Sequence, residues 1–306
     1  FGNGKNAISL MGGAHSDEPV GPFFLRHLVS YLAQLSPDDP MLANFEWWIV
    51  PHVNPDGEQK NQKWYTEHLD YDLASYLKHV FRERPGDDIE FCFPRDKNDT
   101  SARPENKVVN SWWQTCTKNF RLHVSLHGMG FGAGPWFLID KAWTFRTIEL
   151  REKCKTLASL LGYELHDVER NGEKGFFRID KGFTTRPDSK YMIKHFMESG
   201  NPKMASKFRP SSMETIRFLS IDALTLVTEM PLFITPGVGE ILGPPDPKAV
   251  FWKQKIDNWK IALNTGTDTH EVLEQAEQLG LRKMAVKDQM KFQWRFITAG
   301  IEQVLK

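Results

Sequence analysis

The chain has 306 residues, enough for one large α/β domain or two small ones with a sizeable core. Its 39 basic and 39 acidic residues cancel, which argues against adhesion to nucleic acid or to an anionic membrane surface. No apolar run approaches the roughly 20 residues needed to span a bilayer. Three widely spaced cysteines argue against a disulfide framework or a cysteine zinc site. They favour a reducing, cytoplasmic location, while secretion stays open because a trimmed N-terminus would carry no signal peptide.

Strand-like and helix-like segments alternate along the chain. The expected strands are residues 6–13, 44–53, 120–128, 134–140 and 221–230, and the expected helices are residues 19–35, 68–82, 104–117, 144–161 and 250–306. Residues 54–57, Asn-Pro-Asp-Gly, are expected to form a turn after the second strand. This alternation predicts an α/β fold with a mixed, mostly parallel central sheet and helices on both faces. We expect one catalytic domain over residues 1–246 and a helical C-terminal extension over 247–306, packed on that same domain.

The stretch GGAHSDEPVG, residues 12–21, places His15 and Glu18 between the first strand and the first helix. Three residues apart, both side chains can turn toward one point above the sheet edge, although Glu18 could equally serve the helix N-terminus. His127 lies at the carboxyl end of another expected strand and supplies a third candidate ligand. Two imidazoles and one carboxylate leave a position open for water, which is the ligand set of a hydrolytic zinc ion.

Two further residues bear on this interpretation. His123 lies four residues before His127, and four strand residues cover roughly 13 Å, so the two cannot share an ion. We therefore expect His123 in the core, and a structural or supporting role for His52. Glu229 ends an apolar strand, where partial burial would raise its pKa toward a value useful for a general base. The alternative is a glutamate that merely leaves the sheet.

The order of these motifs resembles the M14 zinc carboxypeptidase family. The matching stretches are HSDE at 15–18, VNPDG at 53–57, SLHG at 125–128 and TEMPL at 228–232, and the resemblance covers roughly residues 7–235. It implies the zinc carboxypeptidase fold and one Zn²⁺ held by His15, Glu18 and His127. It also implies that Glu229 activates a water molecule and passes its proton to the leaving amine. Family members carry strands ahead of the first motif, so we expect N-terminal sequence to be missing here.

The chain departs from the family at the substrate residues. Glu90 and Phe91 stand where the family has the Asn-Arg pair that anchors a terminal carboxylate, and the oxyanion arginine and a mobile tyrosine are also absent. The residues nearest in sequence that could take over these roles are Arg95, Lys63, Tyr65 and Tyr191.

Three functions remain open at this point. The first is a zinc metallopeptidase of carboxypeptidase type acting on a peptide. The second is a zinc amidohydrolase of small N-acyl amino acids, as in aspartoacylase-like relatives. The third is a metal-binding or partner-binding protein without turnover. The sequence indicates neither the natural substrate nor the oligomeric state.

Overall fold

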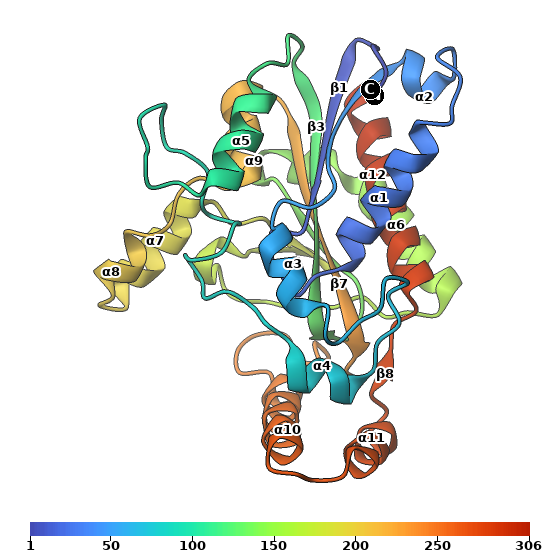
Figure 1. Ribbon diagram of the computed structural model, residues 1–306, viewed down its shortest axis with the longest axis vertical. Coiled ribbons are helices and arrows are strands. Elements are labelled where there is room, and N and C mark those ends of the chain that lie inside the picture. Colours follow the sequence, from blue (N-terminus) through green and yellow to red (C-terminus); the bar gives the residue numbers. More distant parts are fainter.

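The apolar segments of the sequence assemble into one twisted sheet in the computed structural model, which describes residues 1–306 (Figure 1). The strands are β1 (Asn6–Gly12), β2 (Phe45–Val50), β3 (Phe120–Gly132), β4 (Trp136–Ile139), β5 (Arg178–Asp180), β6 (Phe183–Thr185), β7 (Leu224–Ile234) and β8 (Arg282–Lys283). Their order is β2-β1-β3-β7-β4-β6-β5, with β8 beside β7. The neighbours from β2 to β7 are all parallel, whereas β4 and β8 run antiparallel to β7. The predicted mixed, mostly parallel sheet is therefore confirmed.

Helices cover both faces of this sheet (Figure 1). They are α1 (Val20–Leu32), α2 (Pro40–Ala43), α3 (Pro55–Asn61), α4 (Leu73–His79), α5 (Pro104–Trp113), α6 (Ile148–Leu161), α7 (Ser189–Glu198), α8 (Pro202–Ala205), α9 (Ser212–Leu219), α10 (Pro247–Asn264), α11 (Thr269–Gln278) and α12 (Val286–Leu305), with the 3-10 turns η1 (Lys141–Arg146) and η2 (Glu173–Gly175). One face carries α1, α6 and α12, and the other carries α5 and α9 (Figure 1). None of the helices is both long and apolar enough to cross a bilayer.

The C-terminal residues belong to two different parts of the molecule. α12 contributes Phe292 and Phe296, both fully buried, to the same core cluster as Ile8 and Leu122 of the central strands. α10 and α11 instead lie at one end of the molecule and pack against α4 (Figure 1). Burial of α12 against the sheet makes it one of the covering layers of the domain rather than a peripheral tail.

The Asn-Pro-Asp-Gly segment departs from its expected structure. It does not form a free turn but begins α3, with the Asn54 side chain accepting a hydrogen bond of 3.1 Å from the Gly57 backbone N–H. Asparagine is a strong N-cap and proline suits the first helical position, so the same residues that favour a turn also start a helix. The sequence interpretation also missed α7, α8 and α9 and the short strands β5 and β6.

β1 ends at an edge beside Leu126 and His127 of β3, and His127 pairs with Glu229 of β7. β3 and β7 continue past these residues to Gly132 and Ile234, so both are longer than the expected strands 120–128 and 221–230. β1 leaves this edge through Gly13, whose φ of 74° lies in the left-handed region. A Cβ at this position would collide with the imidazole ring of His52, so glycine is required for the chain to turn here. The turn brings residues 14–18 next to His127 of β3.

Candidate metal centre

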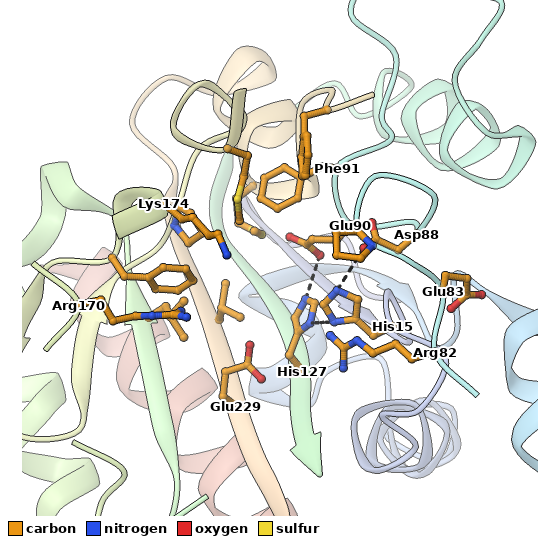
Figure 2. A pocket seen from close by; sticks show the side chains of 18 of the residues that line it. His15, Arg82, Glu83, Asp88, Glu90, Phe91, His127, Arg170, Lys174 and Glu229 are labelled. Atoms are coloured by element: carbon orange, nitrogen blue, oxygen red, sulfur yellow. Dashed lines mark hydrogen bonds and ion pairs between the residues drawn. The ribbon is translucent and has the colours of Figure 1, made fainter. Parts of the chain in front are cut away.

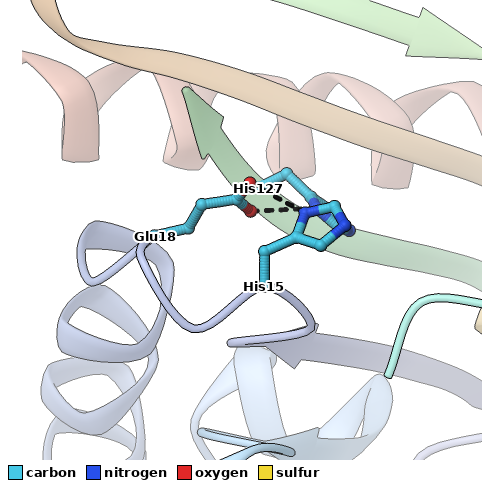
Figure 3. Close-up of side chains that lie close together, drawn as sticks. All are labelled: His15, Glu18 and His127. Carbon is cyan, nitrogen blue, oxygen red and sulfur yellow. Dashed lines mark hydrogen bonds and ion pairs between the residues drawn. The ribbon is translucent and has the colours of Figure 1, made fainter. Parts of the chain in front are cut away.

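Three side chains from two separate elements converge above the sheet edge (Figure 3). His15 and Glu18 come from the turn between β1 and α1, and His127 comes from β3. His15 Nδ1 lies 2.8 Å from Glu18 Oε1, His127 Nδ1 lies 3.0 Å from Glu18 Oε2, and the two Nδ1 atoms are 3.2 Å apart. One ligand atom from each residue therefore falls within 4.8 Å of the others. The three residues that the sequence predicted as ligands are brought together.

The contacts within this cluster fit a bound cation. Two ring nitrogens face each other and the same carboxylate, and Glu18 Oε2 is buried without a well-aligned hydrogen bond. The side chains of Glu18 and His127 are each only 3% exposed, so water cannot satisfy these atoms from outside. Two imidazole nitrogens and one carboxylate oxygen are donors that suit Zn²⁺. A divalent ion among them would satisfy all three at once.

Electrostatics also makes the cluster attractive to a cation. Burial opposes ionisation of Glu18, but His15, His127 and Arg82 outweigh it and hold the pKa of this carboxyl well below its ordinary value. Burial likewise opposes protonation of His127, but the carboxylates of Glu90 and Glu18 raise its pKa well above the usual imidazole value. The surroundings therefore favour positive charge at this point.

The outer ring nitrogens of both histidines meet carboxylates. His127 Nε2 lies 2.9 Å from Ser125 Oγ and 3.1 Å from Glu90 Oε2, and His15 Nε2 lies 3.9 Å from Asp88 Oδ2. A carboxylate behind an imidazole fixes the orientation and tautomer of the ring and raises its basicity as a ligand. Sequence reasoning had considered Glu90 only as a lost substrate anchor, and its place behind His127 was missed.

Glu229 lies beside the cluster because of the sheet register. In the parallel pairing of β3 and β7, Glu229 is the direct partner of His127, so both side chains leave the same face of neighbouring strands. Burial and the nearby carboxylate of Glu18 raise the pKa of Glu229 well above its ordinary value. His123, earlier on β3, is fully buried and bonded to Ser9 and Ser212, as expected for a core histidine.

The cluster opens into a cavity of about 290 Å³ (Figure 2). His15, His127 and Glu229 line it together with three acidic residues, Glu83, Asp88 and Glu90. Apolar side chains form another part of the wall; they include Leu138, Met213, Val227, Phe196 and Phe208. Basic residues also line the cavity, namely Arg82, Arg170 and Lys174.

Arg82 is a cavity residue that the sequence interpretation missed. It follows α4 in an irregular segment, and its Nη1 atom lies 3.0 Å from Glu18 Oε1 and 3.1 Å from Asp17 Oδ1. Burial lowers the pKa of the guanidinium, but these two carboxylates outweigh it, so the net shift is upward and the group stays charged. No periodic pattern marks such a residue, because its position depends on the path of a loop.

Comparison with known proteins agrees with this geometry. The family model described as zinc carboxypeptidase, peptidase family M14, matches residues 2–134, which contain all three candidate ligands. The N-terminal part of this chain, residues 2–134, is thus similar to the zinc carboxypeptidase family. Glu229 lies beyond the matched residues.

Two curated relatives of the zinc carboxypeptidase family match part of the chain. Carboxypeptidase M of Mus musculus is 29% identical over 125 residues, which are 37% of this chain and 25% of the relative. Carboxypeptidase SOL1 of Arabidopsis thaliana is 28% identical over 135 residues, which are 42% of this chain and 24% of the relative. The match thus spans about a quarter of the length of each. Among solved structures, the carboxypeptidase A of Helicoverpa armigera aligns with 98% of this chain and 61% of its own, at 10% identity and a TM-score of 0.48.

The residues expected to replace the family's substrate anchors do not line the cavity. Arg95 donates hydrogen bonds to the backbone carbonyls of Ser206 and Phe208. Tyr65 lines a separate groove beside α1 and α3, and Lys63 precedes it outside the cavity. Tyr191 lines a second cavity instead.

Two other residues that the sequence analysis considered lie near the cluster. Phe91, at the position of the family's anchoring arginine, lines the cavity and packs edge-on against Phe208. His52 is nearly buried, and its Nδ1 accepts a hydrogen bond of 3.0 Å from the Asn54 backbone N–H, which is a supporting rather than a ligand position.

Proposed function

We propose that this protein is a zinc-dependent metallopeptidase of carboxypeptidase type that hydrolyses a peptide or peptide-like amide bond. One observation carries the proposal: His15, Glu18 and His127 converge within 4.8 Å, and Glu229 lies beside them in the same cavity. Similarity of residues 2–134 to the zinc carboxypeptidase family supports the reaction class.

The ligands for one Zn²⁺ would be the Nδ1 atoms of His15 and His127 and the carboxylate of Glu18. When bound, zinc polarises a carbonyl group and lowers the pKa of a coordinated water toward neutrality. Glu90 holds the His127 imidazole from behind, so that this ring keeps its Nδ1 atom directed at Glu18. Asp88, 3.9 Å from His15 Nε2, adds a nearby negative charge.

Glu229 acts as the general base and then as the general acid. It takes a proton from the attacking water and returns that proton to the nitrogen of the leaving amine. Burial raises the pKa of its carboxyl, which strengthens it as a base. Arg82 pairs with Asp17 and Glu18 and so holds the Glu18 carboxylate in its place beside the two histidines.

Metal analysis combined with a Glu229→Gln variant tests this function. We expect purified protein to bind one equivalent of zinc, and Glu229→Gln to bind it equally while losing at least about 100-fold in peptide hydrolysis. Glu164→Gln, at an exposed glutamate remote from the cavity lining, is the matched control and should keep full activity. Unchanged hydrolysis in Glu229→Gln, or protein that binds no zinc, would reject the mechanism.

A second candidate is a zinc amidohydrolase of small N-acyl amino acids. It is favoured by the small cavity, about 290 Å³, and by the phenyl ring of Phe91 in the place of the family's anchoring arginine. A panel of peptides with free and amidated C-termini, assayed beside N-acyl amino acids, separates the two. Faster cleavage of acyl amino acids than of every peptide would replace the peptidase assignment. Zinc binding without turnover on the whole panel would favour a metal-binding or partner-binding protein.

A further inference from the structure

The positive charge available inside the cavity is confined to one side. Arg170 and Lys174 line the cavity across from His15 and Glu90, with Glu229 between the two sides in this view (Figure 2). Both residues come from the segment that joins α6 to β5, which includes η2. The opposite wall is acidic, so the cavity has a basic and an acidic side.

The other basic residue in the lining is already neutralised. Arg82 contacts the carboxylates of Asp17 and Glu18 at 3.1 and 3.0 Å. Arg170 and Lys174 have only one acidic neighbour, Glu173, at 3.7 and 3.5 Å. Glu173 is 44% exposed, and ion pairs of this exposed kind contribute little. The charge on Arg170 and Lys174 therefore remains available to a ligand.

The segment that carries these two residues is held in a defined shape. The Arg170 guanidinium lies 4.7 Å from the centre of the Phe176 ring, a cation–π distance that fixes its direction. Lys174 has a φ of 55°, and the Thr185 hydroxyl donates a hydrogen bond of 2.7 Å to the Gly175 carbonyl. The direction of the Arg170 side chain and the backbone around Lys174 are therefore set by contacts within the fold.

We propose that Arg170 and Lys174 bind a carboxylate of the substrate and thereby determine its specificity. This inference rests on the proposed function for the bond that is cleaved. A guanidinium and an ammonium on the same side of a cavity can bind a carboxylate through charge-assisted hydrogen bonds. The substrate class is a peptide or acyl amino acid with a free carboxylate, whose apolar group lies against Leu138, Met213 and Val227.

Equilibrium binding tests the subsite without any need for hydrolysis. The probes are 3-phenylpropionate and its amide, which differ only in the charged group, measured on zinc-loaded and on metal-free protein. We expect the acid to bind at least about tenfold more tightly than the amide. The double variant Arg170→Ala/Lys174→Ala should reduce that ratio below about twofold in both preparations. The matched control Lys181→Ala, whose lysine pairs with Glu164 outside the cavity, should keep the wild-type ratio.

Two results would overturn the inference. One is an acid-to-amide ratio that survives in the double variant. The other is equal weakening of both ligands, which would mean that the variant had only damaged the cavity. Arg170→Lys, which retains the charge, separates these cases, because it should keep part of the preference if charge is the cause. If the protein shows this binding pattern but has no peptidase activity, the proposed function is rejected and the inference about the carboxylate subsite still holds.

The carboxylate could belong to the C-terminus or to an acidic side chain. Binding to Glu229→Gln protein distinguishes them with three blocked dipeptides: acetyl-Ala-Phe, its C-terminal amide, and acetyl-Ala-Glu amide, whose only carboxylate is on the side chain. Dependence on Arg170 and Lys174 for the first peptide alone would assign the C-terminus. Dependence for the third would assign the side chain. No dependence for any of them would contradict the inference.

Discussion

Replacement of Glu90 should weaken zinc binding although Glu90 is not itself a ligand. Its Oε2 atom lies 3.1 Å from His127 Nε2, on the far side of the ring from Glu18, and its side chain is only 8% exposed. The negative charge behind the ring directs the Nδ1 lone pair toward the metal position and raises its basicity. Glu90→Gln removes the charge but keeps the shape, whereas Glu90→Ala removes both.

The size of the effect follows from these contacts. Loss of a carboxylate partner behind a ligand histidine typically costs about 10- to 100-fold in metal affinity. Ser125 Oγ remains 2.9 Å from the same nitrogen, so the ring keeps one partner in either variant. We therefore expect the lower figure, about tenfold, for Glu90→Gln and a larger loss for Glu90→Ala.

The measurement is the zinc dissociation constant, obtained by competition with a chromophoric chelator. Asp87→Asn is the control, because Asp87 lies in the same segment but pairs with Lys207 and does not line the cavity. Zinc affinities of both Glu90 variants within about twofold of this control would refute the reasoning and leave Glu90 as a cavity residue without influence on the metal.

Two further predictions concern stability. Burial lowers the pKa of His123 from 6.5 to about 3, so between these values the unfolded chain takes up a proton that the folded chain does not. Stability should therefore fall as the pH drops below 6.5, by about 1.4 kcal/mol per pH unit from this residue alone. His123→Gln should show a shallower pH dependence in urea denaturation between pH 6.5 and 4.5, and an unchanged slope would contradict this assignment. Phe296→Ala, which truncates a fully buried ring 4.7 Å from that of Phe137, should cost about 3–5 kcal/mol of unfolding free energy. A separate unfolding transition for residues 247–306 would show that α12 is not part of the same cooperative core.

The sequence by itself determined the central strands and named the four side chains that lie together beside them. Buried strands of a parallel sheet read as apolar runs, so β1, β2, β3, β4 and β7 could each be located from local composition. Neighbouring parallel strands hold their side chains in register, so polar residues at the ends of the apolar runs come together although β3 and β7 continue to Gly132 and Ile234. This is why His15, Glu18, His127 and Glu229 could be named before their contacts were known.

Only the tertiary structure decided which residues surround that cluster. Arg82, Glu90 and Arg170 lie in irregular segments and Lys174 lies in the short turn η2, where no period in the sequence tells which way a side chain points. Arg95, Lys63, Tyr65 and Tyr191 were chosen by nearness along the chain, and the loops carry them elsewhere. A strand fixes the direction of its side chains through hydrogen bonds within the sheet, whereas a loop takes its path from packing against distant residues. The candidate metal ligands could thus be named from local patterns, and the shape and charge of the cavity beside them could not.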